Sequence, residues 1–376
     1  MKEKILHIIS GLGKGGAENV LYCLSSEDTK FDHEILNLGT ERFYVKKFEN
    51  KRIKVNNLGI KSNQFNPFLI FKVIKIIKNV NPHIIQTWMY HSDLLGGLAA
   101  KLAGFQNIIW CVRNSTVDKQ FTKLTTRVVI NMCSFFSKYI PKKIINCSIN
   151  SNHLHQGMGY PKNKCIVISN GVNTNIFKPD QNLRSNTKNK LGLKDKFVIG
   201  FVARWDKQKD IDTFIHSLKI FKKEIHNGWH VIMAGSNLDN KNLKLITKLK
   251  TEKLHEHVSL LGFMNDLVPI YNSMDVCVLT SSYGEGFPNA IIEAMSCEVC
   301  CISSDIGDSK HIIEDNDFIF SIRDVERLKN IFISSFKNIK DKDNWELKKK
   351  QARKRVIENF SLSKMIENYQ KIWTNL

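Results

Sequence analysis

The chain has 376 residues, of which 42% are hydrophobic and 24% charged, which fits a globular protein large enough for two domains with sizeable cores. Lys and Arg total 56 against 36 Asp and Glu, so the formal net charge of +20 predicts an anionic partner, such as a nucleotide or an acidic lipid surface. Because no RNP-type aromatic motif, zinc-finger spacing or helix-turn-helix pattern accompanies this charge, we do not expect nucleic acid as a partner.

The amino-terminal residues show no signal-peptide pattern, and no apolar run approaches the length of a membrane span. Nine cysteines are scattered without the spacing of a disulfide framework. Cys297-x-x-Cys300 lies between an expected helix and an apolar strand, which favours core packing over a redox or metal site. We therefore expect the protein in a reducing cytoplasm.

A buried strand is expected at 5–10, followed by a glycine-rich segment at 11–16 and a helix at 19–26. The glycine segment fits G-x-G-x-x-G, the fingerprint of dinucleotide binding, which also requires an acidic residue at the end of the second strand. The second expected strand, 34–38, ends in Gly39-Thr40 instead. A nicotinamide-dependent oxidoreductase is therefore the weaker interpretation, and a tight turn that needs glycine remains compatible.

Strand and helix patterns then alternate, with strands expected at 53–57, 83–87 and 107–112 and a helix at 66–80. Such alternation implies right-handed crossovers and a parallel sheet. His91 follows the strand at 83–87, so it stands at the carboxyl edge of the sheet, where open α/β sheets bind ligands. A histidine that hydrogen-bonds locally at a helix start is the alternative.

Residues 120–143 mix apolar and basic side chains, among them Phe135, Lys138, Lys142 and Lys143. One interpretation is a buried helix whose lysines extend to solvent. The other is an amphipathic helix that touches an anionic membrane. Both stay open, and an anionic membrane surface is kept as a candidate partner.

The polar tract at 180–196 is expected to be a linker. The second domain starts with a strand at 197–203 that ends at Arg204, and Lys209 lies on the same loop. Two such cations are suited to neutralising a diphosphate without a metal ion, with solvated loop charges as the alternative. Alternating helices and strands continue to terminal helices, of which the last is expected to return to the first domain.

An apolar strand at 275–279 leads into a loop with Glu285 and then a helix that contains Glu293. Pro288 is expected at the first helical position, where its missing N–H needs no partner. The amides of that first turn, together with the helix dipole, favour an anion such as phosphate. Two carboxylates at different depths suit a long substrate with hydroxyls at both ends, such as a nucleotide sugar.

Glu285 and Glu293, separated by seven residues that include Gly-Phe-Pro, resemble the E-x7-E motif of family 4 of the retaining, two-Rossmann-domain (GT-B) glycosyltransferases. Arg204 and Lys209 match the Arg and Lys of the family's G-R-x4-K-G pattern, although other residues replace its glycines. Further segments that resemble family motifs are the loop with Gly15 and Gly16, the string N-G-V-N that begins at Asn170, and Gly262-Phe263.

The resemblance implies an α/β protein of GT-B fold, with two Rossmann-like domains whose parallel sheets face an interdomain cleft. It implies that Glu285 contacts the donor sugar and that Glu293 holds the ribose hydroxyls. It further implies that Arg204 and Lys209 stabilise the departing diphosphate, while His91 faces the sugar from the first domain. The remaining implied substrate-binding residues are Gly15, Gly16, Asn170, Gly262, Gly286, Phe287, Pro288 and Asn289.

The sequence departs from the family pattern at two loops. The family often has a histidine near the position of Asn114, which this chain lacks, and Gly-Gly or Asn-Pro near the loop at 303–309. We expect an acceptor domain at 1–179, with a helix at about 361–376 packed back on it, and a donor domain at 197–360.

The resemblance implies a hexosyl- or N-acetylhexosaminyltransferase, and we expect it to need no metal ion or other cofactor. The expected donor is a UDP-sugar, and the expected acceptor is a lipid-linked or envelope glycan of the O-antigen, capsule or lipopolysaccharide type. We expect peripheral attachment to the inner face of the cell membrane. A nucleotide-sugar epimerase of the same fold is the alternative, and a non-catalytic binding protein is disfavoured because both glutamates and both cations are present.

Overall fold

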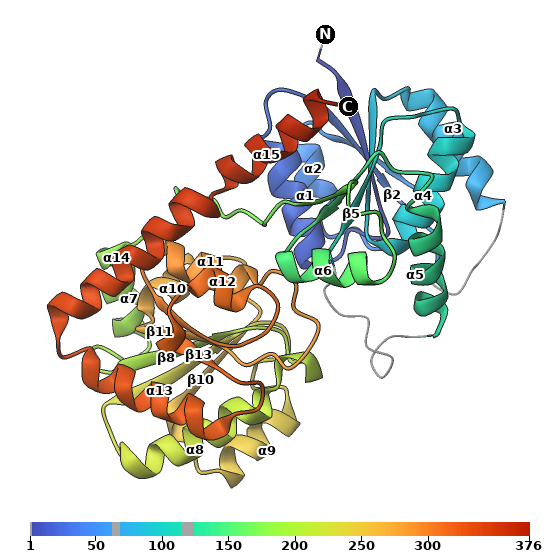
Figure 1. Ribbon diagram of the computed structural model, residues 1–376. Coiled ribbons are helices and arrows are strands. Elements are labelled where there is room, and N and C mark those ends of the chain that lie inside the picture. Colours follow the sequence, from blue (N-terminus) through green and yellow to red (C-terminus); the bar gives the residue numbers. More distant parts are fainter. Residues whose placement is uncertain (1, 62–67, 114–123) are drawn as a thin grey trace. The chain divides into compact units, whose positions relative to one another are not determined.

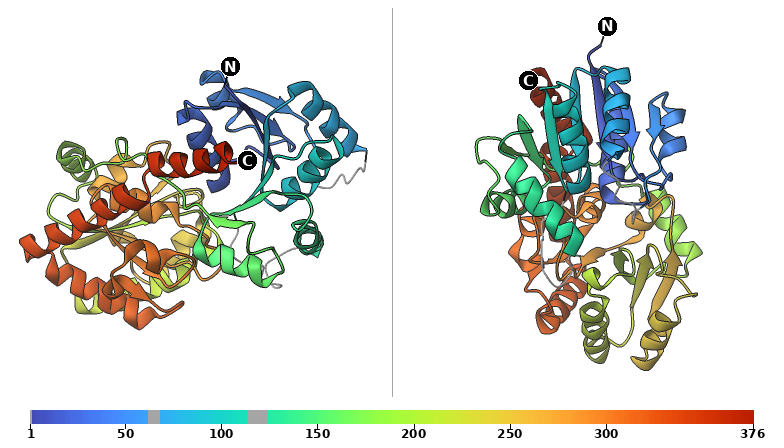
Figure 2. Two further views of the ribbon diagram at one scale, coloured as in Figure 1. Left: turned by 45° about the horizontal axis from the view of Figure 1, so that its top comes forward. Right: turned by 90° about the vertical axis from the view of Figure 1, so that its right-hand side faces the viewer.

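The computed structural model describes residues 2–61, 68–113 and 124–376, which form two compact units (Figure 1). Unit 1 comprises Met1–Gly171 with Leu362–Leu376, and unit 2 comprises Val172–Ser361. Each unit has one parallel sheet between layers of helices, which Figure 2 shows from two further directions. The expected α/β class with two Rossmann-like halves is confirmed.

The described strands of unit 1 form a sheet in the order β3-β2-β1-β4-β5-β6-β7, with all neighbours parallel. The strands are β1 (Lys4–Ile9), β2 (Asp32–Asn37), β3 (Lys54–Asn57), β4 (Ile84–Trp88), β5 (Ile108–Val112), β6 (Lys143–Asn146) and β7 (Cys165–Val167). The helices are α1 (Gly16–Glu27), α2 (Val45–Asn50), α3 (Leu69–Val80), α4 (Tyr90–Leu102), α5 (Leu124–Phe136), α6 (Ile149–Gly157) and α15 (Leu362–Thr374).

Helices cover both faces of the unit 1 sheet. Alternate residues of β1 point to opposite faces, as in any strand. Ile5 and Ile9 pack in a core with α1, α2 and α15, whereas Leu6 and Ile8 pack in a core with α3, α4 and α5. Because both faces are buried, the strands are continuous apolar runs rather than alternating patterns.

The described strands of unit 2 form a second parallel sheet, in the order β10-β9-β8-β11-β12-β13. The strands are β8 (Phe197–Val202), β9 (Trp229–Ala234), β10 (Val258–Gly262), β11 (Val276–Leu279), β12 (Cys300–Ser304) and β13 (Ile319–Phe320). The helices are α7 (Gln181–Lys190), α8 (Ile211–Glu224), α9 (Leu243–Thr251), α10 (Val268–Ser273), α11 (Asn289–Ser296), α12 (Ser309–Ile313), α13 (Val325–Asn338) and α14 (Lys342–Asn359), with short 3-10 turns η1 (Lys207–Lys209), η2 (His255–His257) and η3 (Asn316–Phe318).

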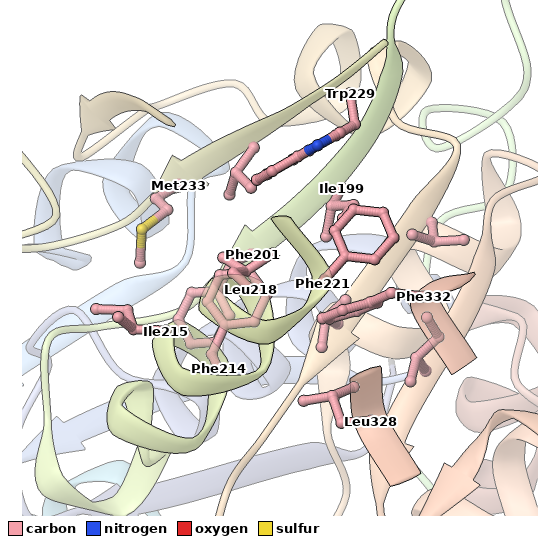
Figure 3. Close-up of a cluster of buried hydrophobic side chains, with 14 of the residues drawn as sticks. Ile199, Phe201, Phe214, Ile215, Leu218, Phe221, Trp229, Met233, Leu328 and Phe332 are labelled. Carbon is pink, nitrogen blue, oxygen red and sulfur yellow. The ribbon is translucent and has the colours of Figure 1, made fainter. Parts of the chain in front are cut away.

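An aromatic core lies between one face of this sheet and helices α8 and α13 (Figure 3). The rings of Phe201 (β8) and Phe214 (α8) stack with centroids 4.8 Å apart, and Phe221 packs edge-on against Trp229 at 5.1 Å. Each such pair adds about 0.5–1.5 kcal/mol beyond its burial of area. This core fixes β8 and α8, the two elements joined by the loop with Arg204 and Lys209.

The polar tract at 180–196, expected to be a linker, instead contains helix α7 of unit 2. The guanidinium of Arg184 pairs with the carboxylate of Asp275, and Lys188 Nζ lies 3.2 Å from the other oxygen of that group. Because Arg184 and Lys188 both pair with Asp275 of unit 2, this polar stretch is folded against that unit. Unit 1 ends at Gly171 rather than at residue 179, since the Val172 amide already bonds within unit 2, to the Phe360 carbonyl at 2.9 Å.

The carboxyl-terminal helices belong to different units, α14 to unit 2 and α15 to unit 1. Cys297 and Cys300 are buried free thiols in the cores of unit 2, which confirms the expectation of core packing. No helix in the described ranges is both long and apolar enough to cross a lipid bilayer.

Candidate active site

The loops after β8 and β11 bring the candidate cations and one candidate carboxylate of unit 2 to the same edge of its sheet. These two strands are parallel neighbours, so their carboxyl ends lie side by side. Arg204 and Lys209 follow β8, and Glu285 follows β11. The strand order thus explains how Lys209 and Glu285, 76 residues apart in sequence, come into contact.

The ammonium group of Lys209 forms an ion pair with Glu285 Oε1. The hydroxyl of Ser281 donates a hydrogen bond to the same oxygen over 2.7 Å. Both charged side chains are sheltered, with exposed fractions of 15% for Lys209 and 10% for Glu285. Solvent and salt therefore screen this pair less than a surface pair, and each charge compensates the other.

Arg204 is exposed and pairs with no carboxylate in the part of the chain that the structure describes. Its backbone is nevertheless fixed, because the amide of Trp205 donates to the Ser236 carbonyl at 2.9 Å. Gly235, with a φ of +140°, approaches the Ala203 carbonyl so closely that a Cβ there would overlap it. The glycine holds the start of the Arg204 loop against the loop after β9, while the guanidinium faces solvent.

Glu293 lies on α11 and accepts a hydrogen bond of 2.8 Å from the hydroxyl of Tyr271 on α10. Its side chain is half-buried, and desolvation raises its pKa to about 7, although the hydrogen bond from Tyr271 opposes that rise. Burial also raises the pKa of Tyr271, so the phenol remains a donor. Glu293 is therefore a carboxyl group that changes its charge near neutral pH.

The start of α11 differs by one residue from the expectation. Pro288 has φ −77° and ψ 99° and precedes the helix, which begins at Asn289, so Pro288 is the N-cap and not the first helical residue. Its carbonyl accepts from the amide of Ile291 at 3.1 Å, as an N-cap carbonyl does. Phe287 is buried against Phe360 with ring centroids 5.4 Å apart, so its side chain belongs to the core.

Glycines set the backbone of the neighbouring loops. Gly262 has a φ of +67° and lies against Asp239. Gly307, with a φ of +54°, allows the loop at 303–309 to approach the carbonyls of Glu285 and Gly286, where a Cβ would lie within 2.6 Å of both oxygens. The loop that departs from the family pattern thus still supports the segment that carries Glu285.

In unit 1, His91 is the second residue of α4 and lies at the carboxyl edge of the sheet. Met89, just before the helix, has a φ of +71°, which is rare for a residue other than glycine. Its amide is held by the Cys111 carbonyl at 3.1 Å. Backbone strain of this kind often lies beside functional residues. The His91 side chain is exposed, yet desolvation by the surrounding protein lowers its pKa, which favours the neutral ring.

The glycine-rich loop of unit 1 lies against a carboxylate that sequence reasoning missed. Gly15 is the N-cap of α1 and Gly16 its first residue. The Glu41 carboxylate fills the space above Gly11 and Gly13, so a Cβ at Gly13 would overlap it. A pyrophosphate over these glycines would meet that negative charge, which disfavours dinucleotide binding here.

Asn170 is buried, and its side-chain oxygen accepts a hydrogen bond from the guanidinium of Arg113 at the end of β5. The same guanidinium lies over the Trp88 ring at 5.5 Å. Arg113 immediately precedes Asn114, the position near which the family often has a histidine. Asn114 itself is outside the described residues, as are residues 120–123 of the expected membrane-contacting stretch.

Comparison with protein families covers both units. The model described as Glycosyltransferase Family 4 matches residues 6–176, and the model described as Glycosyl transferases group 1 matches residues 184–355. The chain belongs to the group 1 glycosyltransferases. The enzyme class expected from the E-x7-E spacing is therefore confirmed.

Two bacterial relatives and one solved structure illustrate the similarity. An Escherichia coli UDP-Gal:alpha-D-GlcNAc-diphosphoundecaprenol alpha-1,3-galactosyltransferase is 26% identical over 82% of this chain and 79% of the relative. A Campylobacter jejuni N,N'-diacetylbacillosaminyl-diphospho-undecaprenol alpha-1,3-N-acetylgalactosaminyltransferase is 25% identical over 70% of each chain. The crystal structure of Anabaena HepE in complex with UDP has a TM-score of 0.85 at 20% identity over the full length of both chains, which shows the GT-B fold.

Among the side chains of this glycosyltransferase that contact the candidate cations and carboxylates, sequence reasoning missed Tyr271, Thr280 and Ser281. One signal was available for the last two. They continue the apolar strand 275–279 as polar residues at the edge where ligands bind, so their hydroxyls needed buried partners.

Proposed function

We propose that this glycosyltransferase moves a hexosyl or N-acetylhexosaminyl group from a UDP-sugar to a hydroxyl of a lipid-linked or envelope glycan, with retention of the anomeric configuration. The observation that carries the proposal is the cluster at the carboxyl edge of unit 2, where the Lys209–Glu285 pair lies on the loops next to Arg204. Two cations on one loop suit a diphosphate leaving group, and Glu293 adds a second carboxylate along the same chain segment.

Each charged group has a role in this proposal. Arg204 binds the diphosphate, and Lys209 shares its ammonium between the diphosphate and Glu285. As the bond from the anomeric carbon to the phosphate oxygen breaks, negative charge grows on the diphosphate and positive charge on the sugar ring. Lys209 stabilises the negative charge on the diphosphate, and Glu285 stabilises the positive charge on the sugar ring. Both side chains are already held in place before the donor binds. No metal ion is required.

The binding roles follow from the resemblance. Glu293 accepts hydrogen bonds from the ribose hydroxyls, and the backbone of Gly262, Gly286 and the first turn of α11, including Asn289, contacts the nucleotide sugar. In unit 1, His91, Gly15, Gly16 and Asn170 contact substrate.

The choice of substrate classes is supported by the relatives. The Escherichia coli relative is named for UDP-Gal, and HepE was crystallised with UDP. Both bacterial relatives are named for diphospho-undecaprenol acceptors. These names support the proposal of a UDP-sugar as the donor and a lipid-linked glycan as the acceptor.

A lipid-linked acceptor implies work at a membrane surface, and unit 1 has a face that fits. Helix α5 and the residues after it expose an apolar stripe at helical spacing: Leu124, Val128, Met132, Phe135 and Tyr139. Helix α4 packs against both α5 and α3 (Figure 1). Helix α3 exposes Phe71 together with Lys72, Lys75 and Lys78. We call these exposed residues the α3–α5 face.

Charge supports the same assignment. Within the described bounds of α3, α4 and α5, the one acidic residue is Asp93, which is buried. Two lysines expected to contribute are engaged elsewhere, because Lys142 donates to Asn107 and to the Leu376 carbonyl, and Lys143 is half-buried in β6. The proposal is peripheral docking of the α3–α5 face on the anionic inner leaflet of the cell membrane.

A nucleotide panel tests the proposed donor. Thermal unfolding is measured with UDP, GDP, ADP, CMP and NAD, and then with UDP-sugars. A ligand present at 100 times its Kd stabilises the folded state by about 2.7 kcal/mol, so at equal concentration the nucleotide that binds most tightly raises the Tm most. We expect that nucleotide to be UDP. The best UDP-sugar is then tested for transfer to an N-acetylglucosaminyl-diphospholipid. Stabilisation by NAD or GDP but not by UDP would contradict the proposed donor.

A further inference from the structure

Two consecutive hydroxyl side chains, Thr280 and Ser281, follow β11 directly and are fully buried. Successive residues of an extended chain point to opposite sides, so the two hydroxyls contact different neighbours. Thr280 contacts the loop that carries Lys209, and Ser281 contacts Glu285. Both members of the ion pair are thus held from one short segment.

Thr280 fixes the backbone beneath Lys209. Its hydroxyl donates to the carbonyl oxygens of Lys209 and Asp210, at 2.7 and 3.1 Å. One residue further, the amide of Ser282 donates to the Gln208 carbonyl at 2.9 Å. Asp210 has a φ of +43°, a left-handed conformation that Asp adopts more readily than most residues other than glycine. The Thr280 hydroxyl bonds to the carbonyls on both sides of this bend and so helps the loop to keep its shape.

Ser281 fixes the carboxylate of Glu285. Its hydroxyl donates to Oε1, the oxygen that Lys209 also reaches. The carbonyl of Ser281 accepts a hydrogen bond of 2.7 Å from the hydroxyl of Ser304 on β12. Ser281 is therefore tied to the neighbouring strand and restricts how the Glu285 carboxylate can turn. A hydrogen bond to an ionised oxygen belongs to the stronger class.

We propose that Thr280 and Ser281 are positioning residues for glycosyl transfer: Thr280 sets the backbone from which Lys209 reaches the diphosphate, and Ser281 sets the carboxylate of Glu285 beside the donor sugar. This inference rests on the roles proposed above for Lys209 and Glu285. Any buried hydroxyl needs an acceptor. Here the acceptors are the Glu285 carboxylate and the backbone carbonyls of Lys209 and Asp210, so we expect loss of a hydroxyl to affect turnover more than folding.

The test compares Thr280→Val and Ser281→Ala with the wild-type full-length chain. Turnover is followed as UDP release from UDP-glucose, UDP-galactose, UDP-N-acetylglucosamine and UDP-N-acetylgalactosamine with an N-acetylglucosaminyl-diphospholipid, and the Kd for UDP is measured by calorimetry. Because misplacing a reacting group by about 1 Å costs about 100-fold, Ser281→Ala should lower kcat by about 10- to 100-fold while the Kd for UDP is unchanged. Thr280→Val should lower kcat and weaken UDP binding, and Thr280→Ser should restore both.

Ser217→Ala is the matched control, because Ser217 is another fully buried hydroxyl of unit 2, bonded to the Thr213 carbonyl at 2.9 Å. It should leave kcat unchanged. In a Glu285→Ala background, Ser281→Ala should lower kcat no further, since it acts through the missing carboxylate.

Two outcomes contradict the positioning inference while the proposed function stands. One is wild-type kcat in both Thr280→Val and Ser281→Ala while Lys209→Ala and Glu285→Ala keep only a small residual kcat. The other is unfolding of either hydroxyl variant at 25 °C, because the hydroxyls would then serve the fold. If Lys209→Ala and Glu285→Ala also keep wild-type turnover, the roles proposed for those two residues are wrong, and the positioning inference falls with them.

Discussion

The ammonium group of Lys209 and the carboxylate of Glu285 form a sheltered ion pair at the carboxyl edge of unit 2. Removing one partner leaves the other charge poorly solvated, whereas removing both leaves none. Lys209→Met and Glu285→Gln should therefore each destabilise the protein by about 1–3 kcal/mol, and the double variant by less than the sum. Urea unfolding measures all four proteins.

The control for this pair is Lys348 with Asp315, whose side chains are two to three times as exposed, at 29% and 31%. Lys348→Met should cost less than about 1 kcal/mol, as surface pairs do. Strict additivity of Lys209→Met and Glu285→Gln would mean that the two charges do not depend on each other.

Arg204 makes a contrasting prediction because its guanidinium is exposed and has no carboxylate partner among the described residues. Arg204→Ala should leave the free energy of unfolding within about 0.5 kcal/mol of wild type. It should nevertheless lower kcat by about 100- to 1,000-fold, since a group that stabilises the leaving diphosphate is lost. Lys207→Ala, exposed in the same loop, is the matched control and should keep its turnover. Equal losses in the two variants would contradict the role given to Arg204.

If Arg204 and Lys209 together neutralise the diphosphate, turnover should not need a divalent cation. Wild-type protein treated with a chelator and then dialysed should transfer sugar at its original rate. Strict dependence on added Mg²⁺ or Mn²⁺ would contradict this prediction and assign charge neutralisation to the metal ion instead.

Much of the fold could be predicted because its strands are buried on both faces. The first strand, expected at 5–10, runs from Lys4 to Ile9, and the alternation of strands and helices fixed the parallel class. The stretch 180–196 was mispredicted because composition describes local preference only. Arg184 and Lys188 find their partner, Asp275, about 90 residues away, and no local pattern indicates that contact.

The candidate site, like the fold, could be predicted only in part. The residue types and spacing of Glu285, Glu293, Arg204 and Lys209 are visible in the sequence. What the sequence could not give is which of them touch, because that depends on the adjacency of β8 and β11. The contact of Tyr271 with Glu293 likewise joins two helices that are separated by a strand.

Glu293 makes a prediction about pH. Desolvation raises its pKa to about 7 in the folded protein, above the value of about 4.3 expected in the unfolded chain. The folded state thus holds this proton more tightly, so the stability it contributes is complete below about pH 4.3 and is lost as pH rises through 7. Glu293→Gln should match wild type in urea unfolding at pH 4 and exceed it at pH 8. Equal differences at both pH values would contradict the shift.

Binding should show the opposite trend, because ribose hydroxyls bind best to the ionised carboxylate. The affinity for uridine, which carries no phosphate that titrates, should rise between pH 6 and pH 8 in wild type and stay constant in Glu293→Gln. Tyr271→Phe removes the hydrogen bond that lowers the pKa of Glu293, so the rise should move to higher pH. Calorimetry with uridine measures all three proteins.

The last prediction concerns the α3–α5 face. Each lysine near an anionic leaflet contributes about 1 kcal/mol, and the exposed apolar side chains add binding that salt does not screen. Wild type should therefore sediment with phosphatidylserine- or cardiolipin-containing liposomes at low salt and only partly at high salt. Replacing Val128, Phe135 and Tyr139 by Ser should remove the part that resists salt, and replacing Lys72, Lys75 and Lys78 by Gln should remove the part that salt screens. Leu243→Ser and Leu347→Ser, equally exposed but on unit 2, are the matched controls and should sediment like wild type. Liposome binding that survives both sets of changes on α3 and α5 would exclude this face as the docking surface.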